Sequence, residues 1–275
     1  MMPGLTGYDT CRQLKSDPRT AQVPVIFVTT LNDVADEMQG FEAGAVDYIT
    51  KPVSPPIVRA RVRTHLSLVS AQALRDTRLQ IIERLGRAAE YKDNETGLHV
   101  IRMSRYAQVL ARAAGWPEAL ADELMNAAPM HDIGKIGVPD HILQKPGPLT
   151  ADEWVIMKRH PEIGATIIGE HASPMLQMAH RIALGHHEKW NGSGYPAGLQ
   201  GTDIPIEARI VAIADVFDAL TTVRPYKKAW TVEAAVTQLE KDAGQHFDPA
   251  LVPLFVQHLP DMLRVREQFQ DPVEP

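Results

Sequence analysis

The first part of the chain, residues 1–55, alternates between two kinds of apolar spacing. Residues 23–29 form a short continuous run rich in β-branched side chains, which predicts a strand buried on both faces. Residues 33–43 carry helical spacing that Gly44 closes, and residues 46–50 read as a second short strand before Lys51 and Pro52. The pattern therefore predicts a partial α/β domain.

Strand signals stop at Ser54, and a long linker helix is predicted over residues 56–90. No glycine or proline occurs from Ile57 to Leu85. Apolar residues recur there at intervals of three or four, at Val58, Val62, Leu66, Val69 and Ala73. The stripe breaks at residues 75–78, so fewer than three heptads are continuous. A homodimer through this helix and packing of the helix on its own domain both remain open.

The rest of the chain, residues 91–275, has helical spacing interrupted by proline and glycine. Helices are predicted at about residues 99–114, 118–131, 151–159, 161–171, 175–189, 205–220, 231–243 and 248–258. Residues 189–202 hold four glycines and one proline, and a loop of this length is usually functional or disordered; we expect a functional one. The predicted fold class is mainly α, with an all-helical domain after the α/β segment and the linker helix.

Composition and charge narrow the classes of function. The 275 residues carry a net charge of −6 and a pI near 6.0, which is not the basic footprint of a nucleic-acid-binding protein. Cys11 is the only cysteine, so imidazole and carboxylate are the available metal ligands. No apolar run approaches the roughly 20 residues of a membrane span, and the first residues lack a signal-peptide pattern. We therefore expect a cytoplasmic protein.

Histidine and acid residues with metal-ligand spacing occur first near the start of the helical domain. Glu95 and His99 are four residues apart, so a carboxylate and an imidazole share one helix face. His131 and Asp132 offer one nitrogen and one oxygen ligand from a single turn. Each pair is a weak signal alone, because such pairs also arise by chance.

Further ligand types follow downstream. His186 and His187 place two imidazoles at neighbouring positions. Asp215 lies in an apolar helical stretch, where a buried carboxylate needs a cation or a proton. A structural alternative for Asp215 is an ion pair with a buried arginine.

Together these positions supply more ligands than one tetrahedral ion can use. The set is Glu95, His99, His131, Asp132, His160, His186, His187 and Asp215. Two or three metals are therefore predicted. Two metals roughly 3.5–4 Å apart can activate a water and hold phosphate oxygens, so phosphodiester hydrolysis is the reaction that this set favours.

Several longer motifs carry a family resemblance over about residues 90–260. They are HDIGKIG at 131–137, HHE at 186–188, GSGYP at 192–196, DVFDALT at 215–221 and RPYK at 224–227. They closely resemble the motifs of the HD-GYP cyclic di-GMP phosphodiesterases, as do residues 95–99 and 158–164. The resemblance implies that all eight ligand positions are filled. It also implies an enzyme that opens cyclic di-GMP to linear pGpG and leaves a second cut to GMP open.

The resemblance also implies cofactors and residue roles. The metals would be iron or manganese, and Glu95 indicates room for three ions. His131, Asp132 and Lys135 would be catalytic. Lys135, Arg224 and Lys227 match the family's phosphate-holding positions, and the alternative for these three residues is solvated surface charge.

The loop Gly194-Tyr195-Pro196 resembles the segment that gives the family its name. In the family this segment is associated with binding GGDEF-domain diguanylate cyclases and with shaping the site. Read from the residues alone, it is a turn with one exposed aromatic side chain, which does not demand a role. The histidines that match no ligand position are His65, His141, His171, His180, His246 and His258.

The amino-terminal part resembles the second half of a two-component receiver domain. The resemblance rests on MPGLTG at 2–7, VIFVT at 25–29, GAVDY at 44–48 and Lys51-Pro52. It implies that Thr29 is the switch hydroxyl, Tyr48 the signalling aromatic and Lys51 the phosphoryl-contacting cation. The phospho-accepting aspartate of that family falls upstream of Met1, so we expect the given chain to lack it, through either a misassigned start or a segment turned into a docking arm.

Three functions are therefore weighed. The first is a response-regulator output enzyme that degrades cyclic di-GMP. The second is an HD-superfamily hydrolase of another nucleotide, for example a different cyclic dinucleotide. The third is a non-catalytic adaptor that binds the dinucleotide or a cyclase, which the complete ligand set argues against.

Overall fold

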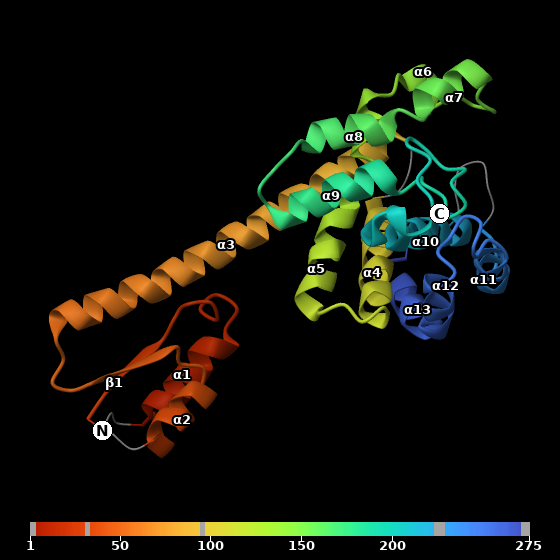
Figure 1. The fold of residues 1–275 in the computed structure, drawn as a ribbon. Coiled ribbons are helices and arrows are strands. Elements are labelled where there is room, and N and C mark those ends of the chain that lie inside the picture. The colour runs from red at the N-terminus through yellow and green to blue at the C-terminus, as the bar shows by residue number, and fades with distance from the viewer. Residues whose placement is uncertain (1–3, 31–33, 94–96, 223–228, 271–275) are drawn as a thin grey trace, which may run out of the picture. The chain divides into compact units, whose positions relative to one another are not determined.

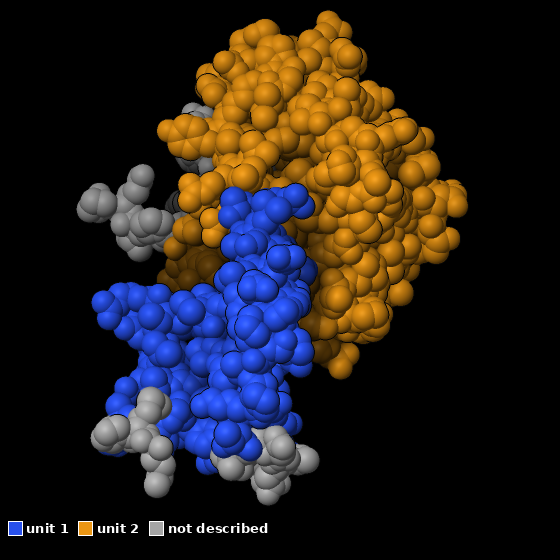
Figure 2. Space-filling view, turned by 90° about the vertical axis from the view of Figure 1, so that its left-hand side faces the viewer, with its two compact units in different colours: residues 1–78 blue, residues 79–275 orange. Residues whose placement is uncertain are grey.

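The computed structural model describes residues 4–30, 34–93, 97–222 and 229–270 (Figure 1). The chain forms two compact units, residues 1–78 and residues 79–275, and the boundary falls inside helix α3 (Pro55–Lys92). Figure 2 colours these units separately. Each has its own cluster of buried apolar side chains, so each is held by its own core.

Unit 1 is an α/β segment built on two short parallel strands. Its elements before α3 are α1 (Gly7–Ser16), β1 (Ile26–Thr29), α2 (Val34–Glu42) and β2 (Asp47–Thr50). The strands pair in register from Ile26 opposite Asp47 to Thr29 opposite Thr50. Both predicted strands are present, but full burial of β1 on both faces was wrong. Val28 is 46% exposed, because the two-stranded sheet leaves one side of β1 uncovered.

Helix α1 was not among the predicted elements, although its start carries a local signal. The Thr6 hydroxyl accepts from the Asp9 amide at 3.1 Å, and the Asp9 carboxylate accepts from the Thr6 amide at 3.3 Å. This reciprocal capping box satisfies amides that the first helical turn leaves unpaired. Cys11, on the inner face of α1, packs with Ala43 and Ala45 to form the small core of the unit.

The predicted linker helix is present as α3, which runs unbroken over 38 residues. From residue 59 to residue 78 its side chains are exposed, except for His65, whose Nε2 lies 3.0 Å from Asp47 Oδ2. Leu66 and Leu74 are 53% and 51% exposed. Arg61 Nη1 also lies 2.5 Å from Asp47 Oδ1, so this stretch of α3 meets its own unit at Asp47 while most of its side chains are exposed. A homodimer through α3 remains a prediction.

The regular secondary structure of unit 2 in the described residues is helical, as the sequence predicted, apart from two isolated β-bridges. Its α-helices after α3 are α4 (Gly97–Ala113), α5 (Glu118–Ala127), α6 (Asp140–Leu143), α7 (Ala151–Met157), α8 (His160–Ile168), α9 (Pro174–Gly185), α10 (Ile206–Thr221), α11 (Val232–Lys241), α12 (Leu251–Gln257) and α13 (Leu259–Gln268). Short 3₁₀ turns η1 (Ala128–Met130), η2 (Ile133–Gly137) and η3 (Gly201–Asp203) interrupt the series. Helices α6 and α13 were not predicted. Of the described helices, none has the length and apolarity to cross a membrane.

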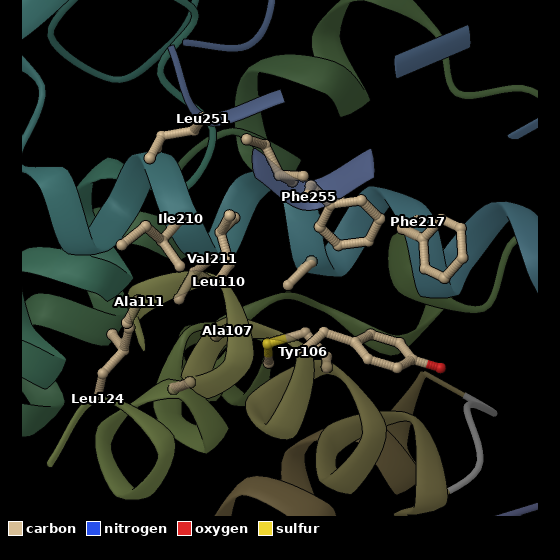
Figure 3. Close-up of a cluster of buried hydrophobic side chains, with 14 of the residues drawn as sticks. Tyr106, Ala107, Leu110, Ala111, Leu124, Ile210, Val211, Phe217, Leu251 and Phe255 are labelled. Carbon is tan, nitrogen blue, oxygen red and sulfur yellow. The ribbon is translucent and has the colours of Figure 1, made fainter. Parts of the chain in front are cut away.

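Helix α10 is the centre of the unit 2 core, where it contacts α4, α9 and α11. Its side chains are apolar on several sides, so most of them are buried. The Phe217 ring meets the rings of Tyr106 from α4 and Phe255 from α12 at centroid distances of 5.5 and 4.9 Å (Figure 3). This core packs α4 and α10 against each other, and both helices carry predicted metal ligands.

Candidate metal centre

Two groups of nitrogen and oxygen ligands converge in unit 2. The Asp132 group consists of Asp132, His160, His186 and His187, and the His99 group consists of His99, His131 and Asp215. Within each group the ligand atoms lie within 4.8 Å of one another. Seven of the eight predicted ligands are therefore brought together, whereas Glu95 lies outside the described residues.

The ligands come from separate segments that the core fixes in place. His99 lies in the first turn of α4, Asp215 in the middle of α10 and His160 at the start of α8. His186 and His187 follow directly after α9, which ends at Gly185 rather than at residue 189 as predicted. Because α4, α9 and α10 share one core, the positions of these ligands depend on packing far from the site.

The backbone changes from helix to 3₁₀ turns where His131 and Asp132 occur. The predicted helix over residues 118–131 was wrong at its end, because α5 stops at Ala127 and Pro129 lies in the turn η1. Asp132 adopts φ −104° and ψ 12°, a sparsely populated region of backbone conformation. As a result, His131 belongs to the His99 group and its neighbour Asp132 to the Asp132 group, with His131 Nε2 only 3.3 Å from Asp132 Oδ2.

Gly134 allows the η2 turn to touch the start of α8. A Cβ atom at Gly134 would lie 1.9 Å from the His160 carbonyl oxygen and 2.5 Å from the Gly164 amide nitrogen. Both contacts are with backbone, so no side chain can move aside to relieve them. The glycine of the HDIGKIG motif therefore sets how closely Asp132 and His160 approach each other.

Replacing Gly134 by alanine is expected to destabilise unit 2 by about 3 kcal/mol, at the upper end of the range for overpacking, and to weaken metal binding because His160 is displaced. Urea unfolding and Mn²⁺ titration of the same preparation measure both effects. The comparison variant is Gly164→Ala on the other side of the same contact, whose Cβ would lie 3.3 Å from the Gly134 amide nitrogen; this milder overlap should cost clearly less than Gly134→Ala. Equal behaviour of the two variants would contradict the role of this contact.

In four of the ligand histidines, one ring nitrogen makes a hydrogen bond to an acceptor that does not belong to either ligand group. The Nδ1 atoms of His131, His160 and His186 lie 3.1, 2.8 and 3.0 Å from the carbonyl oxygens of Ala128, Met157 and Ala183. A carbonyl only accepts, so each Nδ1 carries the proton and donates. His99 Nδ1 lies 2.8 Å from Asp218 Oδ2 in the same way. In the neutral tautomer each Nε2 then presents a lone pair, which is the usual preparation of a metal-binding histidine.

The Nε2 lone pairs of His160 and His186 lie close to each other and to one carboxylate oxygen of Asp132. His160 Nε2 and His186 Nε2 are 3.5 Å apart, and they lie 3.1 and 3.3 Å from Asp132 Oδ1. Asp132 Oδ1 is buried and makes no hydrogen bond with any described residue. Two lone pairs and a carboxylate oxygen repel one another unless a cation lies between them. The donor set therefore fits a divalent metal, and imidazole with carboxylate suits first-row transition ions.

Nearby charges favour the ionised form of Asp132. Burial alone would raise the pKa of this carboxyl, but Lys135 and His131 hold it well below its usual range. Lys135 Nζ lies 2.7 Å from Asp132 Oδ2 and 2.6 Å from Asp93 Oδ2. Burial also lowers the pKa values of His186 and His187, so these rings are neutral and able to ligate. Lys135, predicted to be catalytic, thus contacts the Asp132 group directly.

The arginine-paired acid considered as an alternative for Asp215 is in fact Asp218, one turn further along α10. Asp218 is fully buried, accepts from Arg102 Nε at 2.7 Å and from Arg102 Nη2 at 2.8 Å, and also contacts His99. Burial raises the pKa of Asp218, but hydrogen bonds from His99 and Arg102 lower it below its usual value. Asp215 instead lies with Oδ1 3.3 Å from His99 Nε2. Neither Arg102 nor Asp218 was among the site residues predicted from the sequence.

The end of α3 contacts the η2 segment, and no contact of this kind was predicted from the sequence. Lys92 Nζ donates to the carbonyl oxygens of Ile136 and Val138 at 2.8 and 2.7 Å. The next residue, Asp93, is the second partner of Lys135. A Cβ atom at Gly86 would lie 2.3 Å from the Pro129 carbonyl oxygen, so α3 also approaches η1 closely. The linker helix therefore supports the η1–η2 backbone on both sides of Asp132.

The Gly194-Tyr195-Pro196 loop lies against the Asp132 group. The Tyr195 ring stacks on the His187 ring with centroids 4.7 Å apart. The other two residues predicted to hold phosphate, Arg224 and Lys227, lie outside the described residues. Of the histidines without a ligand role, His246 stacks on Phe247, with centroids 4.2 Å apart.

In unit 1 the three residues predicted from the receiver resemblance lie near the ends of the strands. Thr29 ends β1, and Lys51 directly follows β2, with its amide donating to the Thr29 carbonyl oxygen at 2.7 Å. The Tyr48 ring stacks on Phe27 with centroids 5.6 Å apart and lies beside Phe41. Thr29 and Lys51 are thus neighbours at the carboxyl edge of the sheet, while Tyr48 packs on aromatic side chains.

Comparison with known proteins agrees with this arrangement of the chain. A family model described as HD domain matches residues 69–251, and one described as response regulator receiver domain matches residues 1–63. The cyclic di-GMP phosphodiesterase response regulator RpfG of Xanthomonas campestris pv. campestris is 39% identical, over 98% of this chain and 76% of its own. A 3'3'-cGAMP-specific phosphodiesterase 2 of Vibrio cholerae is 46% identical over 72% of this chain and 38% of its own.

A solved structure gives the same result for the fold. The crystal structure of a cyclic GMP-AMP specific phosphodiesterase of V. cholerae aligns with a TM-score of 0.53 at 17% identity. It covers 70% of this chain, and this chain covers 51% of it, so the two share the fold of the helical unit. The HD and receiver matches, with the 39% identity to RpfG over 98% of this chain, place the chain in the HD-GYP branch of the HD-domain family, in its response-regulator form.

Proposed function

We propose that this chain is a metal-dependent phosphodiesterase that hydrolyses cyclic di-GMP to pGpG, and the proposal leaves a second cut to GMP open. The observation that carries the proposal is the convergence of seven nitrogen and oxygen ligands in two adjoining groups, joined by the neighbours His131 and Asp132. The relative RpfG, named a cyclic di-GMP phosphodiesterase response regulator, supports the choice of substrate.

Each of the two ligand groups would hold one metal, and iron or manganese fits their nitrogen and oxygen donors. When bound, two such metals activate water and neutralise charge on a phosphate. The chain contributes the positions: carbonyl-bound Nδ1 atoms orient the rings of His131, His160 and His186, and Asp132 lies between both groups. These contacts keep the ligand geometry in place before the substrate arrives, so little reorganisation remains for the reaction.

Lys135 would hold a phosphate oxygen of the substrate. Its ammonium group already lies beside Asp132 and has Asp93 as a second partner, so it can contact an incoming phosphate without leaving the site. By the family resemblance, Arg224 and Lys227 would bind the remaining phosphate charge. A guanidinium and ammonium set of this kind is what phosphoryl transfer requires.

Removing Glu95 tests the number of metals. If this residue holds a third ion, Glu95→Gln should lower the metal content from three to two per chain, whereas His99 and the other ligands keep their ions. Elemental analysis of anaerobically purified wild type and variant gives the count directly. An unchanged count would reject the three-ion site but leave the two described groups as they are.

The function itself is tested with the full chain, purified without oxygen. Chromatography of cyclic di-GMP incubated with the protein and added Mn²⁺ or Fe²⁺ should give pGpG or GMP, and elemental analysis should give two or three metals per chain. Intact substrate with a folded, metal-loaded protein would reject the proposed substrate. A protein that binds no metal would reject the metal centre.

A second candidate substrate, 3'3'-cGAMP, is supported by the names of other relatives. The 46% identical protein is named a 3'3'-cGAMP-specific phosphodiesterase, and it matches over 72% of this chain. Incubating the enzyme with equal concentrations of the two cyclic dinucleotides separates the candidates, because the ratio of initial rates equals the ratio of their kcat/KM values. We expect cyclic di-GMP to be consumed faster, as the longer match to RpfG favours it.

The receiver-like unit 1 would make this enzyme the output of a two-component system in the cytoplasm. A GGDEF-domain cyclase would dock on the Gly194-Tyr195-Pro196 loop, and two chains would pair along the exposed stretch of α3. These partners follow from the family resemblance and from the exposed apolar residues of α3, and each remains a proposal.

A further inference from the structure

The residue after the His186-His187 pair is a buried acid with an unusual set of partners. Glu188 is 3% exposed, and it lies beyond the end of α9. Its Oε1 accepts from the amides of Ala197 and Gly198 at 2.7 and 3.2 Å, and its Oε2 accepts from the amide of Leu199 at 3.0 Å. Three backbone amides thus donate to one buried carboxyl group, and these hydrogen bonds fasten the distal end of the loop to the end of α9.

The rest of the loop turns tightly over the same point. A Cβ atom at Gly194 would lie 2.3 Å from the Lys189 amide nitrogen and 2.5 Å from Glu188 Cα, so only glycine fits there. The Tyr195 amide donates to the His187 carbonyl oxygen at 3.2 Å. At its other end the loop is tied to unit 2 by the Trp190 amide, which donates to the His246 carbonyl oxygen at 3.0 Å.

This construction presses Tyr195 against one metal-ligand ring. The rings of Tyr195 and His187 are 4.7 Å apart and inclined by 25°, which is a stacked arrangement. Lys158 Nζ lies 5.4 Å from the Tyr195 ring, within cation–π distance. Tyr195 is half-buried, so its ring forms a wall of the Asp132 group instead of extending into solvent.

His187 differs from the other histidines in how its ring is held. His99, His131, His160 and His186 each have Nδ1 placed by a hydrogen-bond acceptor. Among the described residues, no hydrogen bond reaches either ring nitrogen of His187. Its ring is placed by contacts with Tyr195, with His186 at 4.0 Å and with His160 at 4.9 Å between centroids.

We propose that Glu188 and Tyr195 are positioning residues for His187: the carboxylate holds the loop, the loop holds the tyrosine ring, and the ring fixes the plane of the imidazole. The inference rests on the proposed metal-dependent function, because it assigns His187 as a ligand. Stacking here replaces the hydrogen bond that orients the other ligand histidines. The Gly-Tyr-Pro loop therefore acts through its backbone and its aromatic ring, and the tyrosine hydroxyl is not needed for this role.

The proposal predicts which ligand group loses affinity. Disturbing a group that orients a metal ligand typically lowers metal affinity by about 10–100-fold. Glu188→Gln replaces an acceptor oxygen facing loop amides with an NH₂ group, so the loop should detach. Tyr195→Leu removes the ring, and Tyr195→Phe keeps it. Only the Asp132 group contains His187, so the His99 group should keep its affinity.

The experiment is Mn²⁺ titration of the metal-free full chain, followed by the electron paramagnetic resonance of free Mn²⁺. We expect Glu188→Gln and Tyr195→Leu to weaken one class of site by about 10–100-fold and leave the other unchanged, with Tyr195→Phe like the wild type. The matched control is Glu207→Gln, which removes a buried acid whose partner is Arg181 and not the loop; it should bind as the wild type does.

Several outcomes would overturn the inference. They are unchanged binding in both Glu188→Gln and Tyr195→Leu, an equal loss in Tyr195→Phe and Tyr195→Leu, or a loss in Glu207→Gln as large as that in Glu188→Gln. Circular dichroism of each variant verifies folding, and the half-buried Tyr195 allows the test even if Glu188→Gln does not fold. Since Mn²⁺ is the probe, the result holds whether or not cyclic di-GMP is hydrolysed. If the variants bind Mn²⁺ normally and the wild type hydrolyses cyclic di-GMP, only the positioning inference is rejected and the proposed function stands.

Discussion

Asp132→Asn is expected to reduce hydrolysis of the cyclic dinucleotide by at least about 10³-fold and to remove metal from the protein. Asp132 Oδ1 lies beside the Nε2 atoms of His160 and His186, and Oδ2 lies near His131 and Lys135. An asparagine keeps the shape but loses the negative charge. It also directs an NH₂ group either at imidazole lone pairs or at the Lys135 ammonium. Both ligand groups should lose metal affinity, and Lys135 should lose its ion pair with Asp132.

The measurement is kcat/KM at saturating Mn²⁺, together with metal content by elemental analysis. The matched control is Asp248→Asn, a buried aspartate whose Oδ2 pairs with Arg209 at 2.6 Å. This control has a similar stability cost but no ligand role, so it should retain metal. Wild-type activity or metal content in Asp132→Asn would remove the basis for the proposed centre.

The ligands themselves could be predicted because their signals are local in sequence. Neighbouring pairs such as His131-Asp132 and His186-His187 are visible without knowledge of the fold, and so is the four-residue spacing of Glu95 and His99. Most helices of unit 2 were likewise predictable from periodicity, but α6 and α13 were missed, and some ends were misplaced where turns take over, such as Pro129 after α5. The predictions that were correct are therefore those that depend on residues close together in the sequence.

The residues that support the ligands could not be predicted from the sequence. Their partners are either distant along the chain or are backbone groups, which any residue type supplies. Asp218 meets Arg102 across 116 positions of the chain, and neither position has a spacing that indicates the other. Glu188 binds backbone amides, and Lys92 binds backbone carbonyls, so the identity of the partner residue is irrelevant in both cases. Such contacts depend on which segments the fold brings together, which periodicity does not specify.

The supporting pair Asp218 and Arg102 makes a second prediction with a large effect. Asp218→Asn is expected to lower the free energy of unfolding by about 3–5 kcal/mol, because it takes the charge of the Asp218 carboxylate away from the buried guanidinium of Arg102. It should also lower metal affinity at the His99 group by about 10–100-fold, because His99 Nδ1 loses a carboxylate acceptor. Urea unfolding of the metal-free protein and Mn²⁺ titration measure the two effects separately.

A double variant separates the structural effect of Asp218 from its effect on the ligand. In Arg102→Met with Asp218→Asn the buried charge is gone, so part of the lost stability should return, and the two single effects should not add. The metal affinity should stay low, since His99 still lacks its carboxylate partner. If affinity recovered together with stability, Asp218 would act only by holding the fold. If affinity alone stays low, Asp218 orients His99 for the metal, and the buried ion pair with Arg102 serves to keep that carboxylate charged and in place.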